Sequence, residues 1–177
     1  MSTRCQIGIY EKDFSEKTKA DAVKLSKAIQ NKAEVLLYRH SDGYPGAIGE
    51  GDEGKDGVIP DILPFVRAFV EKRGYEVEYL GACLTAYLKY WHCGEKSNNK
   101  LDNYNVIING FKVFTLDHGI CKYIHLDIAY FYAITPTCIK VYKKSGGWDN
   151  EPFVFTEIES HEIGVEPYKS VGIQVRI

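Results

Sequence analysis

The sequence changes character after residue 103, and this change limits the folds that the chain can adopt. Before that point, two short strand-like segments alternate with segments of helical spacing. After it, β-branched and aromatic segments follow one another, with turn signals at Asn109-Gly110 and Thr135-Pro136. Strands joined by hairpin turns form antiparallel sheets on which helices pack. The sequence therefore predicts an α+β fold, a mainly antiparallel sheet with two or three helices packed on one face.

The individual elements follow from hydrophobic periodicity and from capping residues. Residues 4–10 alternate between apolar and other side chains, which is typical of a half-buried strand. A helix capped by Asp13 or Ser15 is expected to run to about residue 31. The other expected elements are a strand over 33–40, a helix from Pro60 to Gly74, a helix over 77–91, and strands over 106–108, 113–116, 125–134, 138–142, 153–158 and 172–177.

Composition indicates one globular domain over 1–177, with 45% hydrophobic and 26% charged residues. The formal net charge is −2, and the densest basic stretch, 12–32, is interleaved with acidic residues. Nucleic-acid-binding proteins carry a basic excess or stripe, so the sequence disfavours nucleic acid as a partner. It indicates no cofactor.

The cysteines indicate a reducing compartment. There are five of them, with no Cys-x-x-Cys pair, which argues against a disulfide framework and against a zinc ribbon. No run approaches the roughly 20 apolar residues needed to span a bilayer, and the first residues lack an apolar signal core. We therefore expect a cytoplasmic protein without a membrane segment.

The segment 37–45, Leu-Tyr-Arg-His-Ser-Asp-Gly-Tyr-Pro, is the strongest local signal of a functional site. Arg39 offers a planar set of donors, and His40 exchanges a proton near neutral pH. Asp42 can orient that imidazole or accept from a ligand, and Tyr44 follows in the same turn. The alternative is a structural turn, because Asp-Gly is ordinary turn chemistry.

The same segment carries a resemblance to a known family. The start Thr3-Arg-Cys-x-Ile7, the turn of 37–45 and the strand Asp127-Ile-Ala-Tyr-Phe-Tyr132 resemble a family of small uncharacterised proteins found in bacteria, archaea and their phages. The resemblance covers about half of the chain. The chain departs from the family pattern in a lysine-rich insert before Ala33 and in an extended tail after Lys144. It implies a fold and a viral or mobile-element setting, in the host cytosol, and no activity.

A second candidate site comes from the histidines and aspartates of the second half. On a strand, His125 and Asp127 would point to the same face. With His118 or His40 they would supply enough ligands for a catalytic divalent metal. Their spacing matches no known metal motif, and polar residues on a solvated sheet face are the alternative.

Between residues 43 and 57, six glycines stand among acidic residues, which predicts a flexible loop. Its resemblance to a calcium loop fails at Gly54 and Leu63, and its Gly-x-Gly-x-x-Gly run lacks the strand and helix of a dinucleotide site. The sequence gives little support for nucleophilic catalysis, since it contains no Gly-x-Ser-x-Gly elbow.

The leading hypothesis is a non-enzymatic binding protein for a partner protein, a second copy included, or for a small polar ligand. Arg39, His40, Asp42 and Tyr44 would form the site, with 46–57 as an adaptable contact and Arg4 as a further counter-charge for an anion. The first alternative is a metal-assisted or acid–base hydrolase that uses His40 or His125 with Asp42 or Asp127. The second is an assembly subunit with an exposed edge at 171–177.

Overall fold

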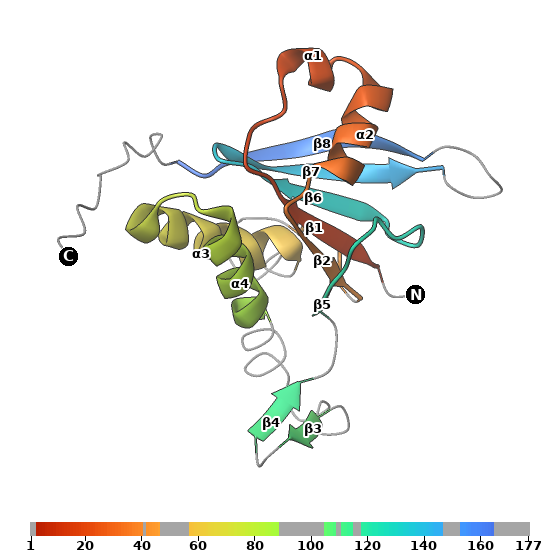
Figure 1. Ribbon diagram of the computed structural model, residues 1–177. Coiled ribbons are helices and arrows are strands. Elements are labelled where there is room, and N and C mark those ends of the chain that lie inside the picture. Colours follow the sequence, from red (N-terminus) through yellow and green to blue (C-terminus); the bar gives the residue numbers. More distant parts are fainter. Residues whose placement is uncertain are drawn as a thin grey trace.

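The computed structural model describes residues 3–40, 42–46, 57–88, 105–108, 111–114, 118–146 and 153–164. Its core is a six-stranded sheet (Figure 1). In spatial order the strands are β5 (His118–Ile120), β2 (Val35–Arg39), β1 (Cys5–Ile9), β6 (Tyr130–Ile134), β7 (Cys138–Ser145) and β8 (Val154–Glu162). A separate two-stranded sheet pairs β3 (Asn105–Ile108) with β4 (Phe111–Phe114).

The strand pairings are mostly antiparallel. β1 pairs antiparallel with β2, β2 with β5, β6 with β7, and β7 with β8. The exception is the central pair, in which β1 runs parallel to β6 with Cys5 opposite Tyr130. The predicted α+β fold with a mainly antiparallel sheet is therefore confirmed.

The described residues form four helices: α1 (Glu16–Lys19), α2 (Ala22–Asn31), α3 (Val58–Arg73) and α4 (Val77–Tyr87). The single helix expected before residue 31 is divided into α1 and α2. The Ser15 side chain accepts a hydrogen bond from the Thr18 N–H and starts α1. Asp21 accepts from the N–H groups of Val23 and Lys24 and starts a second helix. Two capping residues six positions apart therefore define two helices where periodicity alone suggested one.

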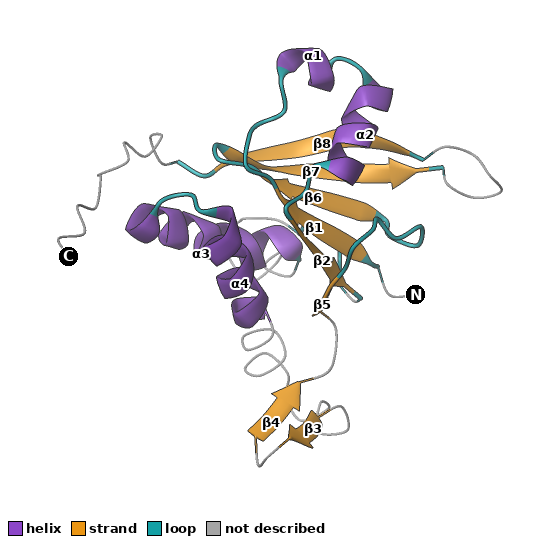
Figure 2. Ribbon diagram, in the orientation of Figure 1, coloured by secondary structure: helices purple, strands orange, loops and turns teal. Residues whose placement is uncertain are grey.

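The helices lie on both faces of the sheet, whereas the sequence analysis expected one covered face (Figure 2). One apolar cluster joins Ile7 and Ile9 of β1 to residues of α3 and α4, such as Ile62 and Leu84. A second cluster joins Phe131 and its neighbours on the other face to α2. All five residues of β1 are consequently buried, and β1 is not the half-buried strand that its alternation suggested.

Two local turn predictions are confirmed, whereas the predicted start of one strand was wrong. Gly74, at φ 87°, ends α3 as predicted, and the Thr135 N–H donates to the Cys138 carbonyl in the β6–β7 turn. The strand expected over 125–134 begins only at Tyr130, and residues 121–129 form a loop. Several predicted features lie outside the described residues, namely Ser41, the loop over 47–56, the helix beyond residue 88 and the strand over 172–177.

Among the helices of the described ranges, none has both the length and the apolar character needed to cross a membrane.

Candidate functional site

Arg39 belongs to the protein interior. Its side chain is 1% exposed, and its Nη1 lies 2.9 Å from Oδ2 of Asp61, which is itself 4% exposed. Asp61 stands in the first turn of α3, so this ion pair joins the end of β2 to that helix. A guanidinium enclosed in this way is not placed to serve as the surface counter-charge that the sequence analysis expected for an anionic ligand.

The turn that follows β2 is held against the start of β1. The Gly43 N–H donates to the Thr3 carbonyl at 2.8 Å, and the Tyr132 hydroxyl donates to the Gly43 carbonyl at 2.9 Å. A Cβ on Gly43 would lie 2.8 Å from the backbone of Arg4, so a residue with a side chain would displace the turn. Asp42, at φ 50°, is exposed and forms no ion pair with the described residues. The turn thus has the structural role that was the alternative for this segment.

Tyr38, one residue before Arg39, points to the opposite face of the sheet and brings both candidate histidines together. Its ring stacks on the His125 ring, with the centroids 4.6 Å apart and the planes 28° apart. It also meets the His40 ring edge-on at a centroid distance of 6.2 Å. Its hydroxyl lies 3.4 Å from Oδ2 of Asp127. His40 and His125 therefore lie on the same face of the sheet, as the hydrolase hypothesis requires.

Arg4 completes this cluster from the start of β1. Its guanidinium Nη1 forms an ion pair with Oδ2 of Asp127, and both side chains are more than one third exposed. The other carboxylate oxygen of Asp127 lies 3.9 Å from Nδ1 of His125. His125 and Asp127 thus come together in the loop before β6. The prediction that they share one face of a strand was wrong, because the strand begins only after them.

Gln6 fixes the loop that carries His125 and Asp127. Its side chain is fully buried on β1, and its amide nitrogen donates to Sγ of Cys121 at 2.8 Å and to the Tyr123 carbonyl at 2.9 Å. Its amide oxygen accepts from the His125 N–H at 2.8 Å. A single buried side chain therefore satisfies backbone groups at two points of the loop, which holds its conformation without a strand ladder.

Other hydrogen bonds hold the two ends of the loop. The Cys121 N–H donates to the Leu36 carbonyl, and the Ala129 N–H donates to the Arg4 carbonyl. The ammonium group of Lys144, on β7, donates to the Leu126 carbonyl at 2.8 Å. The loop is therefore fastened to β1, β2 and β7 along its length.

Two large apolar side chains protrude from this fixed backbone, since Tyr123 is 68% exposed and Leu126 is 56% exposed. Ile120 is also exposed, but it stands opposite Leu37 in the β2–β5 pair and therefore lies on the other face of the sheet, with His118. An isolated exposed apolar residue is unremarkable, whereas two on one anchored loop offer a contact surface. We call residues 121–127, together with Arg4, Tyr38 and His40, the β5–β6 platform.

Partial burial raises the pKa of two acid groups in the platform. Burial, with a smaller contribution from the Asp127 charge, raises the pKa of the Tyr38 hydroxyl above its ordinary value. Burial also raises the pKa of the Cys121 thiol, although the hydrogen bond from Gln6 acts in the opposite direction. Both groups are therefore neutral near pH 7, and neither acts there as an anionic nucleophile.

The residues proposed for a metal site are divided between the two faces of the sheet. His118 is buried and stands opposite Arg39 in the β2–β5 pair, so it shares the face of α3. His125 and Asp127 lie on the opposite, exposed side with Tyr38. Among the described residues, no group of three or more His, Cys, Asp or Glu side chains is arranged to hold a metal ion.

The candidates Arg4, His40, His125 and Asp127 lie together in the structure, but the residues that hold them were not predicted from the sequence. Tyr38 and Gln6 each lie within an apparently ordinary strand, and their partners are about a hundred positions away along the chain. Tyr44, also proposed, is 37% exposed and lies in the turn beside the start of β1. A polar Gln at the centre of an apolar strand was the one visible signal, because a buried amide requires partners.

No protein-family model matches the chain, and neither a curated protein nor a solved structure shows significant similarity to it. The resemblance to a family of small uncharacterised proteins stays a prediction.

Proposed function

We propose that this chain is a non-enzymatic binding protein that recognises a partner protein through the β5–β6 platform. The observation that carries the proposal is the exposure of Tyr123 and Leu126 on a backbone fastened by Gln6 and Lys144. A surface that is already rigid loses little conformational entropy when it is covered by a partner. Exposed apolar side chains then gain the hydrophobic free energy that they lack in the free protein.

The composition of the platform fits a protein partner better than a small anion. Protein interfaces are enriched in tyrosine and arginine at their centre, with polar groups at the rim. Here Tyr38 and Tyr123 supply aromatic surface, and the charges of Arg4 and Asp127 neutralise each other. An anionic ligand would find Arg4 engaged with Asp127 and Arg39 buried with Asp61. We therefore expect a partner with an apolar centre and with polar groups that meet the imidazoles.

The test compares two double variants that each remove two exposed apolar side chains. In Tyr123→Ser/Leu126→Ser the loss is on the platform, and in Val23→Ser/Ile158→Ser it is on α2 and β8. Immobilised wild type and the control pair should retain the same partner from a cell extract. The platform pair should retain at most about one tenth as much of this partner, because central aromatic contacts contribute about 2 kcal/mol each. Equal retention by both pairs would exclude the platform as the interface.

Sedimentation velocity with the same proteins examines the case in which the partner is a second copy. A dimer of the wild type that persists in the control pair and dissociates in the platform pair would identify a self-association surface.

One observation favours an acid–base hydrolase as a second candidate. His40 and His125 both contact the ring of Tyr38, and Asp127 lies within 3.9 Å of His125. In such a mechanism one imidazole would remove a proton from water and the other would donate a proton to the leaving group. Arg4 would lie beside an anionic substrate. The described geometry does not include Asp42 in this set.

Hydrolysis is tested with model phosphodiester and carboxylic ester substrates on the wild type, His40→Asn and His125→Asn. The hydrolase candidate requires a bell-shaped pH profile in the wild type and a loss of about a hundredfold in each variant. Activity that both variants retain would come from a contaminant or from another site. If the wild type turns over none of these substrates but still retains its partner, the hydrolase candidate is excluded and the binding function remains.

A further inference from the structure

The two outer strands of the six-stranded sheet differ in how their edges are protected. β5 is one edge of the sheet and β8 is the other (Figure 1). An outer strand presents backbone N–H and C=O groups with which another chain can pair, and folded proteins protect such edges with charged side chains, bulges or covering groups. A difference in protection therefore indicates which edge is suited to receive an added strand.

β8 is covered near both of its ends. The Phe155 N–H donates to Oγ of Ser26 on α2 at 3.2 Å. The Glu162 carbonyl accepts from Nη2 of Arg67 on α3 at 2.7 Å. Side chains of two helices thus take the place of a neighbouring strand at these positions.

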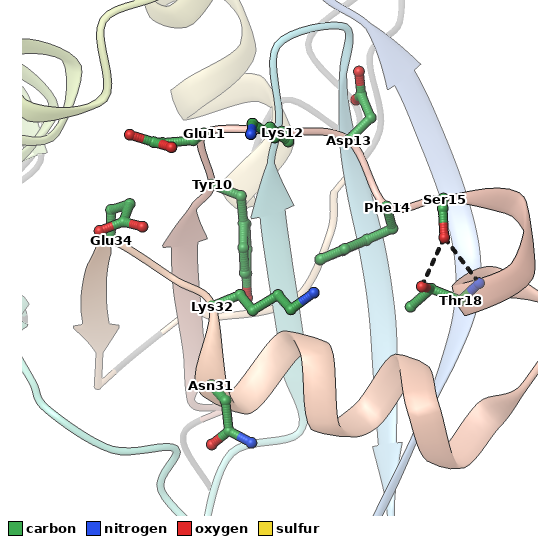
Figure 3. A pocket seen from close by; sticks show the side chains of 10 residues that line it. All are labelled: Tyr10, Glu11, Lys12, Asp13, Phe14, Ser15, Thr18, Asn31, Lys32 and Glu34. Atoms are coloured by element: carbon green, nitrogen blue, oxygen red, sulfur yellow. Dashed lines mark hydrogen bonds between the residues drawn. The ribbon is translucent and has the colours of Figure 1, made fainter.

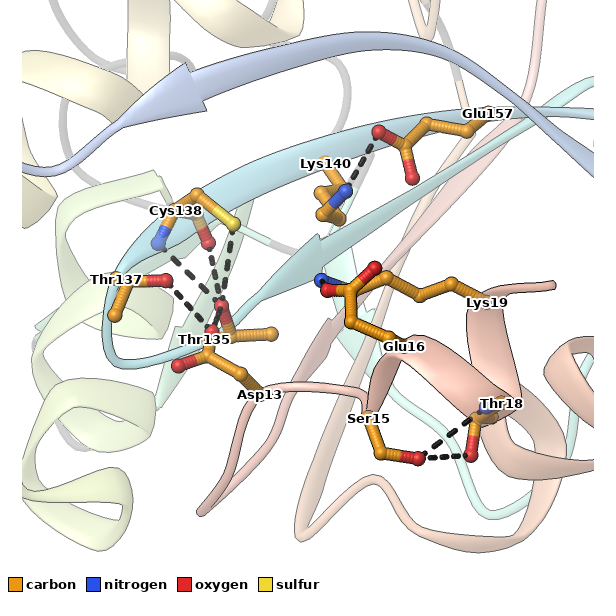
Figure 4. A network of polar contacts seen from close by, with 10 residues as sticks. All are labelled: Asp13, Ser15, Glu16, Thr18, Lys19, Thr135, Thr137, Cys138, Lys140 and Glu157. Carbon is orange, nitrogen blue, oxygen red and sulfur yellow. Dashed lines mark hydrogen bonds and ion pairs between the residues drawn. The ribbon is translucent and has the colours of Figure 1, made fainter.

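The middle of β8 is irregular and acidic. Its pairing with β7 shifts register between Val141 and Tyr142, and a bulge of this kind bends an edge strand. Three of its nine residues are glutamates, and one of them, Glu157, is paired with Lys140 at 2.6 Å (Figure 4). An added strand would meet a bent ladder and several carboxylates, so this edge is unsuited to pairing.

β5 is neither acidic nor irregular. Its three residues, His118-Gly-Ile, pair regularly with β2. The Cys121 N–H donates to the Leu36 carbonyl, which fixes the alternation of this ladder. The Gly119 backbone is consequently turned toward β2, and the N–H and C=O of Ile120 are turned away from it. In the part of the chain that the structure describes, no group bonds to these two outer groups of Ile120.

Both faces of the sheet are accessible beside this edge. Gly119 stands opposite Tyr38, and a Cβ built on Gly119 would have no heavy atom within 4 Å, so the face over Gly119 is open. On the other face, Ile120 is 74% exposed. A strand added beside β5 would therefore place alternate side chains over Gly119 toward Tyr38 and against Ile120.

The hollow at the carboxyl end of β1 offers no comparable preference. It is bounded by residues 10–15 and 31–34 (Figure 3). Its exposed side chains carry both signs of charge close together, with Lys12 next to Glu11 along the chain. Such a surface has no preference for a ligand of either charge.

We propose that the partner protein adds an extended segment to the outer edge of β5, as a further strand of the sheet. This inference rests on the proposed binding function of the platform, because β5 leads directly into residues 121–127 and the two surfaces are continuous. The backbone of the added segment bonds to the N–H and C=O of Ile120, and an apolar residue of the segment lies against the Ile120 side chain. Since β5 is short, the platform supplies the rest of the contact area.

The first probe is a decapeptide selected from a displayed random library on the immobilised full chain. In the free protein the Ile120 amide should exchange its hydrogen rapidly and the Gly119 amide slowly, as measured by NMR. A selected peptide should slow exchange at Ile120 about tenfold or more, because it supplies the missing acceptor. If no peptide is selected, or if bound peptides leave exchange at Ile120 unchanged, the proposal is wrong.

Backbone methylation of the selected peptide separates strand addition from side-chain recognition. Two synthetic versions carry N-methyl groups at alternate residues, in one register or in the other. Only every second residue of an added strand bonds to β5, so one version should bind about tenfold more weakly or worse and the other almost as well as the parent. Equal effects of the two versions would overturn the proposal. This comparison needs no variant of the protein.

A pair of variants extends the test to the natural partner. Ile120→Pro removes the outer N–H, which is tolerated at an edge, whereas Ile120→Val keeps it. The partner that the wild type retains from a cell extract should be retained about tenfold less by Ile120→Pro and equally by Ile120→Val. If the platform pair Tyr123→Ser/Leu126→Ser loses this partner while Ile120→Pro retains it, the platform is the interface and strand addition is wrong.

Two further outcomes are distinct. Retention of the partner by both Ile120→Pro and the platform pair would show that the proposed function itself is wrong. A dimer of the wild type that dissociates in Ile120→Pro, measured by sedimentation velocity, would show that the added strand comes from a second copy and would overturn its assignment to another protein.

Discussion

Two arginine–aspartate pairs lie close to one another at the same end of the central sheet, and they differ in almost every respect except chemistry. Arg39 and Asp61 are 1% and 4% exposed, and they join β2 to α3. Arg4 and Asp127 are 37% and 39% exposed, and they join β1 to the loop before β6. Arg39 stands opposite Cys5, the immediate neighbour of Arg4, in the β1–β2 register.

The difference shows how burial assigns similar groups to different tasks. Removing two charges from water is costly, so the buried pair is maintained only if both members are present. The exposed pair is surrounded by solvent and contributes little to stability, which leaves it available for recognition. We therefore expect mutations of the first pair to act on folding and mutations of the second pair to act on binding.

The largest effect should come from breaking the buried pair. Asp61→Ala leaves the Arg39 guanidinium without its carboxylate partner, and the free energy of unfolding should fall by about 3–5 kcal/mol in urea denaturation. The double variant Arg39→Met/Asp61→Leu removes both charges and should recover most of that loss. If the free energy of unfolding of Asp61→Ala lies within about 1 kcal/mol of that of the wild type, the comparison between the two pairs fails, since it rests on the cost of removing one member of a buried ion pair.

An intermediate effect should follow from the loss of the Gln6 side-chain amide. Gln6→Leu preserves volume but leaves the Tyr123 carbonyl and the His125 N–H without their partner, at a cost of about 1–3 kcal/mol. Hydrogen exchange should then rise over residues 121–129 and remain unchanged in α3. A uniform rise over both regions would mean that Gln6 stabilises the whole sheet and has no particular relation to the platform.

A smaller effect on stability is expected for the exposed pair. Asp127→Asn should alter the free energy of unfolding by less than about 1 kcal/mol. The same change removes a negative charge beside Tyr38, so the pKa of the Tyr38 hydroxyl should fall while burial still holds it above the ordinary value. NMR of tyrosine labelled at Cζ measures this pKa directly. A pKa that does not move would place Asp127 too far from Tyr38 to influence it.

The smallest expected effect is on the reactivity of two thiols. Cys83 on α4 is exposed, whereas Cys121 is partly covered and burial raises the pKa of its thiol. Less thiolate is therefore present on Cys121 at pH 8, and iodoacetamide should modify Cys83 several times faster, as measured by peptide mass spectrometry. Gln6→Leu should reduce the difference between the two modification rates, because it loosens the loop that contains Cys121. Faster modification of Cys121 than of Cys83 in the wild type would contradict the described anchoring.

The sequence predicted those parts of the molecule that depend on neighbouring residues. Gly74 ends a helix, Thr135-Pro136 turns a hairpin, and Asn109-Gly110 separates two strands that pair, because each effect acts over a few positions. The fate of Arg39 could not be predicted in the same way. Its burial depends on Asp61 and on the packing of α3, and a strand-end arginine is equally compatible with solvent.

The candidate site shows the same limit. His125 and Asp127 were correctly grouped, but on a strand that the chain does not form there. The loop takes its place because Gln6 and Lys144 satisfy its backbone from other strands. Alternation along a sequence cannot reveal such partners, since they are distant along the chain and adjacent only after folding.

The parallel pairing of β1 with β6 has a consequence for how the protein is made. β1 leaves the ribosome long before its partner Tyr130–Ile134, because the two strands are far apart along the chain. Until then Ile7 and its neighbours cannot reach the environment in which they are fully buried. We expect nascent chains that stop before β6 to expose this apolar strand, and therefore to bind chaperones or to be degraded, so that β6 is a checkpoint for the quality of each newly synthesised molecule.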